Sequence, residues 1–445
     1  MPAVDKLKKL ATGSAAIMAS RLAGAGVGFL TQFLMVKLMG AHDLGVFYAA
    51  SSLAAVLGVI VAQGYPQIAA RFVGRYRNKQ DQALTGYFTG HAMREGLLAA
   101  IAAAAGLTIW SLAWPGIDAV DRMAYAIAGW MLVSIVALNI MTNIAGGMRS
   151  FALCYMPEGL VRPIIFFIVI CAAGIGGFGL TAVSAMAIFA LITTGIACAV
   201  SVLLRRKMPV MRWRAASQAG VAWRWRREAW QLVLMAVFTN FFADVGILVA
   251  VPFLSKPELA IFGLCLKLAL LVGYFVQIGQ QMVVPDMADA RHSGDTDRLQ
   301  SAAWRSIVVP SLISLISIAV IYVFGAELLA FFGPEFAAGR TTLLILLTAQ
   351  LFRALAGPGV HLLTLSGIQR INMGVAVTSL GVLFAASALL TPWLGIEGAA
   401  IAVLIVYAYW TGVSALALRH LKEPAVDIVW LTLRRFRAAE PSTQI

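Results

Sequence analysis

Three basic residues, Arg21, Lys267 and Arg353, stand inside long apolar stretches of the sequence. Arg353 lies near the middle of the apolar segment 341–365, with about 15 Å of apolar helix on either side at about 1.5 Å per residue. A cation at the centre of a membrane helix costs about 2.5–3.5 kcal/mol on insertion scales, so exposure to lipid is disfavoured. Asp244 is the one acidic residue at similar depth. The surplus of cations predicts a water-filled cavity that binds an anion. In the alternative, Asp244 pairs with one cation and the others bond to carbonyls or amides.

Further polar residues recur at helical spacing beside these charges. One stripe consists of Lys267 with Tyr274, Gln277 and Gln281. A shorter stripe consists of Asp244 with Asn240. Tyr48 and Asn143 are further candidates for lining the same cavity, although single aromatic and amide residues also serve in packing. The pair Gly357–Pro358 predicts a bend just beyond Arg353, which suits either a moving helix or a packing kink.

The segments that must position these residues are membrane helices. The chain has 445 residues, of which 61% are hydrophobic and 12% charged, whereas soluble domains are about half apolar and about a quarter charged. Apolar stretches of about 20 residues, enough to cross a bilayer, recur twelve times, at 14–36, 43–64, 92–114, 123–146, 161–178, 180–204, 230–253, 258–284, 306–325, 341–365, 371–391 and 394–417.

The basic residues indicate the orientation of these spans. With the N-terminus in the cytoplasm, 26 of the 34 Lys and Arg residues fall in cytoplasmic segments, 4 in external segments and 4 within or beside spans. This positive-inside bias places both termini in the cytoplasm. The densest basic segment, 205–229, interleaves Trp with Arg and is expected to face anionic membrane lipids. The net charge of +14 therefore does not indicate a nucleic-acid partner.

An internal repeat divides the chain near this basic segment. At one constant offset, which aligns Ala41 with Lys256, the sequences that start at these two residues match without gaps; the matched pairs are Asp43 with Glu258, Leu44 with Leu259, Phe47 with Phe262, Leu53 with Leu268, Ala54 with Ala269, Gly58 with Gly273, Val61 with Val276 and Gly64 with Gly279. The sequence thus predicts an N-terminal six-helix bundle over 1–204, a linker over 205–229, a C-terminal six-helix bundle over 230–418 and a basic tail over 419–445. Because six is an even number of spans, both bundles begin on the same side of the membrane, so the symmetry axis that relates them lies along the membrane normal.

The same segments resemble polysaccharide exporters of the multidrug/oligosaccharidyl-lipid/polysaccharide (MOP) superfamily. The opening stretch SRLAGAGVGFLTQFLMVKLMGAHDLG resembles their first helices, NFFADVGILVAVPFLSKPELAIFG their seventh and eighth, and FFGPEFAAG their external segment before the tenth. Ala260 departs from the family, which tends to have glycine there, as do Phe47 and Phe262, where tyrosine is common. The spans and the repeat predict an all-α membrane protein with two six-helix bundles around a central cavity. The resemblance implies that it acts in a bacterial inner membrane as a flippase for a polyprenyl-diphosphate-linked oligosaccharide.

In this interpretation Arg21, Lys267 and Arg353 bind the diphosphate, while Tyr48, Asn143, Tyr274, Gln277 and Gln281 line the path of the sugar. The main alternative is a multidrug exporter driven by Na⁺ or H⁺ through Asp244 and Asn240. A membrane glycan polymerase or glycosyltransferase is less well supported, because the predicted external loops are short. His and Cys lack metal-site spacing, so no metal or other cofactor is expected. Coupling could use H⁺, Na⁺ or the membrane potential. The expected state is a monomer that works beside glycan polymerase and export machinery.

Overall fold

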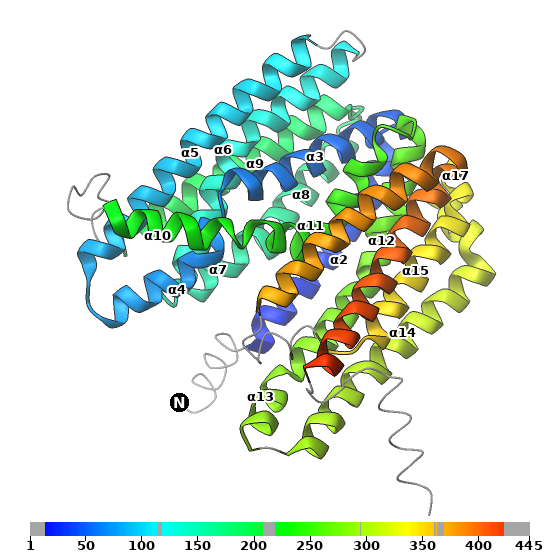
Figure 1. Cartoon of the computed structure of the whole chain (residues 1–445). Helices are drawn as coiled ribbons and strands as arrows, with labels where there is room; N and C mark the ends of the chain where they lie inside the picture. The colour runs from blue at the N-terminus through cyan, green and yellow to red at the C-terminus, as the bar shows by residue number, and fades with distance from the viewer. Residues whose placement is uncertain are drawn as a thin grey trace, which may run out of the picture. The chain divides into compact units, whose positions relative to one another are not determined.

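The computed structural model describes residues 14–113, 118–207, 219–293, 295–359, 362 and 369–421, and within these ranges the secondary structure is helical with no β-strand (Figure 1). The longer helices are α2 (Ser14–Leu38), α3 (Ala41–Val61), α5 (Gln82–Ala113), α6 (Ala119–Gly147), α8 (Arg162–Ile175), α9 (Ala182–Arg205), α11 (Val233–Ala250), α12 (Lys256–Met282), α14 (Thr296–Ala330), α15 (Arg340–Leu355) and α17 (Gln369–His420). Shorter helices connect them: α4 (Tyr65–Asn78), α7 (Phe151–Met156), the π-helical η1 (Pro157–Val161), α10 (Ala219–Trp230), α13 (Val284–Ser293) and the 3₁₀-helical η3 (Pro334–Gly339).

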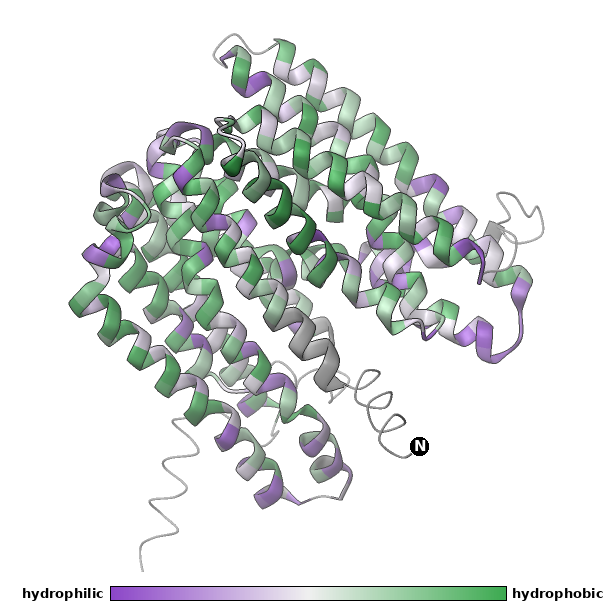
Figure 2. Cartoon of the chain, turned by 180° about the vertical axis from the view of Figure 1, so that it is seen from behind, coloured by the Kyte–Doolittle hydropathy of each residue, from purple (hydrophilic) through white to green (hydrophobic). Residues whose placement is uncertain are grey.

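Each of the twelve predicted spans coincides with a helix. Nine helices of the described chain are long and apolar enough to cross a membrane. The remaining three spans are α2, whose described apolar part is Ala23–Leu38, the 16-residue α15, and a second span within α17. Hydrophobic residues follow the lengths of the helices, and hydrophilic residues gather at their ends and connections (Figure 2). Large apolar side chains are exposed on the helices, for example Leu191 at 73% and Trp393 at 86%, as expected for surfaces that face lipid.

Helix α17 is two helices that meet at a turn. It is 52 residues long, about 78 Å at 1.5 Å per residue, more than twice the thickness of the hydrocarbon core. Gly395 in its middle has φ +57°, which glycine adopts without steric cost. A Cβ atom on Gly398 would lie 2.3 Å from the carbonyl oxygen of Leu390, a separation that a continuous helix does not allow. The chain therefore reverses at Gly395 and forms the last two spans.

The predicted repeat extends at the same offset over the described helices other than α10, whose counterpart lies almost entirely outside the described residues. Helix α3 begins at Ala41, and α12 begins at Lys256, the residue that the repeat aligns with it. At this offset α11 corresponds to α2, α13 to α4, and α14 to α5. Likewise η3 with α15 corresponds to α6, and the two parts of α17 correspond to α8 and α9. Asp43 and Glu258 each lie in the first turn of their helix. The matched residues Leu44 and Leu259 are both completely buried. The two halves therefore repeat one series of helices without insertion.

The chain forms two compact units. The first comprises residues up to Val251 together with Ser255–Ala260, and the second comprises Pro252–Leu254 and the chain from Ile261 onward. Helix α11, which the sequence prediction assigned to the C-terminal bundle beginning at 230, packs against α3 in the first unit. Much of the linker predicted at 205–229 forms the folded helix α10, with 208–218 outside the described residues, as is the tail beyond 421.

In the first unit, α6 is the central helix, and α3, α4, α5 and α9 all pack against it. Small residues allow these helices to approach closely: a Cβ atom on Gly58 of α3 would lie 2.6 Å from the Cγ2 atom of Ile135 on α6. In the second unit, α15 packs against both α14 and α17. There, a Cβ atom on Gly279 of α12 would lie 2.7 Å from the ring of Pro310 on α14. Each unit thus has its own tightly packed set of helices.

Candidate functional site

Helix α15 ends just after Arg353, which corrects the prediction that this residue lies near mid-helix. The last helical residue is Leu355, and Gly357 follows with φ +64°. The N–H of Gly357 donates to the carbonyl of Ala354 at 3.1 Å and no longer to the carbonyl of Arg353, as it would in a continuing helix. Arg353 therefore stands in the last turn, where the negative end of the helix dipole and unpaired carbonyls favour a cation. The bend predicted from Gly357–Pro358 is a break in the helix at 356–358, after which positions 359 and 362 are helical again and the N–H of Leu362 donates to the carbonyl of Pro358 at 3.0 Å.

The side-chain amide of Gln280, on α12, closes this helix end. Its Nε2 atom donates to the carbonyl of Arg353 at 3.3 Å and to the carbonyl of Gly357 at 3.0 Å. Gln280 is buried, with 8% of its surface exposed. It therefore satisfies carbonyls that would otherwise be buried without a partner and holds the backbone of Arg353 against α12. The helical spacing of polar residues in the sequence points to the adjacent Gln281 and not to Gln280.

A second buried amide, Gln350, lies one turn before Arg353 on α15. Its side chain is 1% exposed, and a Cβ atom on Gly273 of α12 would lie 2.6 Å from its Oε1 atom. Within the described residues, neither Gln350 Oε1 nor Arg353 Nε has a hydrogen-bond partner, although both atoms are buried. Such groups are expensive to bury. One buried acceptor, Gln350 Oε1, and one buried donor, Arg353 Nε–H, therefore have no partner among the described residues at the α12–α15 contact.

The predicted stripe on α12 flanks this contact. Gly273 and Gln280, seven residues apart, mark the face of α12 that meets α15. Lys267, Tyr274 and Gln281 are spaced to lie about 100° around the helix from that face, with Gln277 between the two faces. Tyr274 is 42% exposed, and the other three are half-buried. The second unit thus combines Lys267, the three predicted sugar-lining residues and Arg353 on two packed helices.

The internal repeat supplies a comparison for each of these polar positions. At the repeat offset, Gln350 corresponds to Ile135, and the contact of Gly273 with Gln350 repeats the contact of Gly58 with Ile135. Arg353 corresponds in the same way to Leu138, which is completely buried. The same helix packing is therefore achieved with apolar side chains in the first unit. The fold does not require Gln350 or Arg353, and aligning the two halves over this segment would have revealed this from the sequence.

The predicted ion-coupling residues lie in the first unit, on α11. Asp244 is half-buried, and its Oδ1 atom accepts a hydrogen bond of 2.9 Å from the Ser52 hydroxyl on α3. Between Asn240 and Asp244, Phe241 has the non-helical angles φ −126° and ψ 22°, so α11 is kinked there. Asn240 is exposed. Ser52 corresponds to Lys267 at the repeat offset, so equivalent positions hold a hydroxyl bonded to an acid in one unit and a cation in the other.

Two further predicted residues of the first unit, Tyr48 and Asn143, form hydrogen bonds within that unit. Tyr48 is completely buried, and its hydroxyl donates to Gln32 Oε1 at 2.7 Å. This placement does not fit a residue that lines a passage. Asn143 is half-buried and donates to the carbonyl of Asn139, one turn earlier on α6, at 2.9 Å. The side chain of Arg21 lies outside the described residues, and within those residues no group of three or more His, Cys, Asp or Glu forms a metal site.

Comparison with known proteins identifies the fold. No protein-family profile matches the chain, and no curated protein is significantly similar to it. Among solved structures, lipid II flippase MurJ in an inward closed conformation has a TM-score of 0.74 at 13% identity, covering 94% of this chain and 90% of MurJ. An inward-facing multidrug resistance MATE family transporter of the MOP superfamily has a TM-score of 0.70 at 13% identity, with 97% and 100% covered. A MOP superfamily transporter from Pyrococcus furiosus, described as having a binding pocket of reverse polarity, has a TM-score of 0.54 at 15% identity, with 93% and 97% covered.

Proposed function

We propose that this chain, which has the fold of the MOP superfamily transporters, is a flippase for a polyprenyl-diphosphate-linked oligosaccharide. The oligosaccharide would be the repeat unit of an exopolysaccharide, a capsule or an O-antigen, moved from the cytoplasmic to the outer leaflet by alternating access. Similar folds occur in multidrug transporters and in a lipid II flippase. The fold is therefore compatible with either a drug or a lipid-linked substrate. The side chains of the candidate site are needed to distinguish the two.

The observation that carries the proposal is the replacement of Ile135 and Leu138 by Gln350 and Arg353 at equivalent, closely packed positions. Burying a polar or charged group without partners costs free energy. Because the first unit packs the same helices with apolar residues, packing does not explain these substitutions. An anionic ligand would explain Arg353, because its buried Nε–H is a donor without a partner among the described residues. The Oε1 atom of Gln350, which has no partner among those residues either, is an acceptor, which a hydroxyl of the attached sugar would satisfy.

A diphosphate suits this chemistry. Arg carries a permanent charge and five N–H donors, and it binds phosphate oxygens in bidentate fashion. The carbonyl end of α15 can hold one side of the Arg353 guanidinium and leave other donors for the ligand. Within the described residues, no acidic side chain forms an ion pair with Arg353. Lys267 and Arg21 would add positive charge, while Tyr274, Gln277 and Gln281 would contact the sugars.

The second candidate is a Na⁺- or H⁺-coupled multidrug exporter. It is favoured by the half-buried Asp244, which accepts a hydrogen bond from Ser52 beside the kink of α11. A carboxylate beside freed backbone carbonyls is suited to a small cation. This site is compatible with the flippase as well, because the same ion could drive lipid transport. The charge of the transported molecule distinguishes the two functions.

The test uses the repeat to design a substitution that should fold. Arg353→Leu places on α15 the residue that the first unit carries at Leu138, so it should insert normally with neutral or increased stability. We expect it to reduce transport of the lipid-linked oligosaccharide by about thirtyfold or more, the factor for about 2 kcal/mol. The measurement is accumulation of the oligosaccharide on the cytoplasmic leaflet and loss of surface polysaccharide.

Arg353→Lys keeps the charge and is the matched control, with partial activity expected. Normal surface polysaccharide in cells that carry Arg353→Leu would remove this residue from the mechanism. If deletion of the whole gene causes no lipid-linked oligosaccharide to accumulate but increases sensitivity to cationic drugs, the multidrug alternative is correct.

A further inference from the structure

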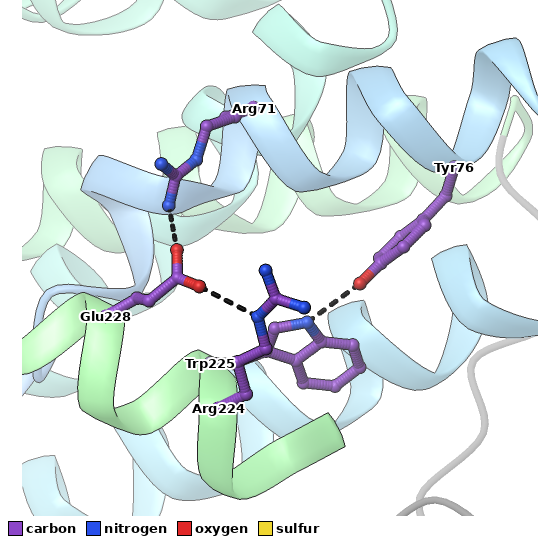
Figure 3. A network of polar contacts seen from close by, with 5 residues as sticks. All are labelled: Arg71, Tyr76, Arg224, Trp225 and Glu228. Atoms are coloured by element: carbon purple, nitrogen blue, oxygen red, sulfur yellow. Dashed lines mark hydrogen bonds and ion pairs between the residues drawn. The ribbon is translucent and has the colours of Figure 1, made fainter. Parts of the chain in front are cut away.

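Helix α10, in the first unit, is anchored by one completely buried tryptophan. The indole of Trp225 has 0% exposure, and its Nε1 atom donates to the Tyr76 hydroxyl at 2.9 Å (Figure 3). Burial raises the pKa of Tyr76, which stays protonated near neutral pH. The Trp225 ring also lies 5.0 Å from the Phe88 ring and 5.4 Å from the Tyr87 ring, centroid to centroid. Trp225 thus seats α10 against α4 and α5.

Ion pairs fix α10 on both sides of this anchor. Glu228 pairs with Arg71 of α4 and, at 3.0 Å, with Arg224 of α10 itself (Figure 3). Arg226 pairs with Glu95 of α5 at 2.6 Å. The pairs are partly exposed, so each contributes little stability, but together they set the rotation of α10 about its axis. The acidic residues near α10 are used in this attachment.

The opposite face of α10 presents a different set of side chains. Trp223, Arg227 and Trp230 are spaced i, i+4 and i+7, and so form one stripe on the side away from Trp225. Trp223 is 61% exposed and Trp230 57% exposed. The Arg227 guanidinium lies 4.9 Å from the centroid of the Trp223 ring, and within the described chain it has no acidic partner. We call these three residues the outer stripe.

The outer stripe lies next to a membrane span. Helix α10 ends at Trp230, and the apolar helix α11 begins at Val233 after a turn of two residues. Helix α10 crosses the direction of α5, α6 and α9, which run side by side in the same unit (Figure 1). With three arginines in twelve residues it cannot lie in hydrocarbon. It therefore stands at the level where a span meets the headgroups of the adjacent leaflet.

We propose that the outer stripe binds the headgroup of an anionic phospholipid of this leaflet, with Arg227 on the phosphate and the two tryptophans on either side of it. Trp is enriched at membrane interfaces, where its ring is apolar and its N–H reaches polar groups. Arg offers the paired donors that a phosphate accepts. The charge of the outer stripe complements an anionic headgroup, and its exposed rings complement the interface. This inference does not depend on the identity of the transported substrate.

The experiment measures lipid retention by the intact chain. The protein is purified in nanodiscs of phosphatidylcholine that contain increasing phosphatidylglycerol, and the lipids that remain bound after transfer to detergent are counted by native mass spectrometry. Arg227→Gln should weaken phosphatidylglycerol retention by about fivefold. Lys79→Gln is the matched control, because it removes the same charge from an exposed position outside α10 and should leave retention within about twofold.

Several outcomes decide the inference. If Arg227→Gln and Lys79→Gln weaken phosphatidylglycerol retention equally, the lipid is held by non-specific charge attraction, and the proposed binding by the outer stripe is wrong. Retention of phosphatidylcholine as strong as that of phosphatidylglycerol would overturn it as well. Binding of a single-stranded oligonucleotide that is lost only in Arg227→Gln, without any effect on lipid, would assign the stripe to nucleic acid instead. Trp223→Phe combined with Trp230→Phe should keep folding, since Trp225 remains, and should weaken phosphatidylglycerol retention; unchanged retention would exclude the tryptophans.

Discussion

At the level of single side chains, the position of Arg353 depends on where its helix stops. The sequence places it in the middle of an apolar stretch, which leaves its charge isolated. In the structure the stretch is interrupted at Leu355, and Arg353 lies in the last turn of α15. A helix C-terminus stabilises a cation by about 0.3–1 kcal/mol. This term lowers the cost of keeping Arg353 within the bilayer but does not occupy all of its donors.

Gln280 is the residue that makes this helix end possible, and its substitution is a direct test. Gln280→Leu removes the donor to the carbonyls of Arg353 and Gly357. We expect a loss of stability of about 1–3 kcal/mol, the usual cost of an unpaired buried polar group, and a lower rate of transport because the backbone of Arg353 is released. Thermal unfolding in detergent and the lipid accumulation assay measure the two effects. Gln281→Leu, one residue further, is the control for stability only, because Gln281 is itself a proposed sugar contact and its loss should also lower transport. Equal stability of the two variants would contradict the capping role of Gln280.

At the level of helices, close packing depends on positions without a Cβ atom. Gly45, on α3, approaches the first residue of α12 so closely that a Cβ atom would lie 1.9 Å from the carbonyl oxygen of Lys256. The Lys256 ammonium in turn pairs with the buried Asp121 of α6 at 3.5 Å. The beginning of α12 is thereby attached to the first unit before the helix continues into the second.

Gly45→Ala should therefore damage the protein more than an ordinary glycine substitution. The new methyl group meets backbone, which cannot rotate away, so we expect a lower unfolding temperature and reduced yield of folded protein. Gly106→Ala on α5 is the control: nothing lies within 4 Å of its Cβ position, and alanine favours a helix by about 1 kcal/mol over glycine. Fluorescence-detected size-exclusion chromatography with heating compares them. A Gly45→Ala protein as stable as Gly106→Ala would show that α3 and α12 can separate at no cost.

Across the entire chain, one constant offset relates two series of helices that share positions but differ in polarity. The first series is apolar at Ile135 and Leu138, and the second is polar at Gln350 and Arg353. An even number of spans in each series brings both to the same side of the membrane. The distribution of Lys and Arg predicts that this side is the cytoplasm.

This topology can be measured with reporter fusions. Green fluorescent protein attached after His420 should fluoresce, and alkaline phosphatase at the same position should be inactive, because the predicted location is cytoplasmic. Fusions after Gly177, between α8 and α9, should give the reverse pattern, since an odd number of spans precedes them. The same signal at both positions would contradict the twelve-span topology.

Much of the fold could be predicted from the sequence, because it depends on local composition. Lipid solvates apolar side chains and cannot bond to backbone groups, so each stretch of about 20 apolar residues must form a helix. The repeat was visible for a related reason: Gly58 and Gly273 each face a side chain of a neighbouring helix, and both halves keep that contact. The spans and the repeat could therefore be predicted, because both are determined by which residues stand at each position of the sequence.

The site could be predicted only in part, since it depends on contacts between distant segments. Lys267, Tyr274 and Arg353 were identified because charge and polarity stand out in an apolar chain. The role of Gln280, the end of α15 and the full burial of Tyr48 were not predicted. Gln280 and Gln281 are adjacent and chemically identical, and what separates them is which one faces α15. Which of the two faces α15 depends on how α12 packs against a helix far along the chain. The residues around Gln280 and Gln281 do not determine this packing.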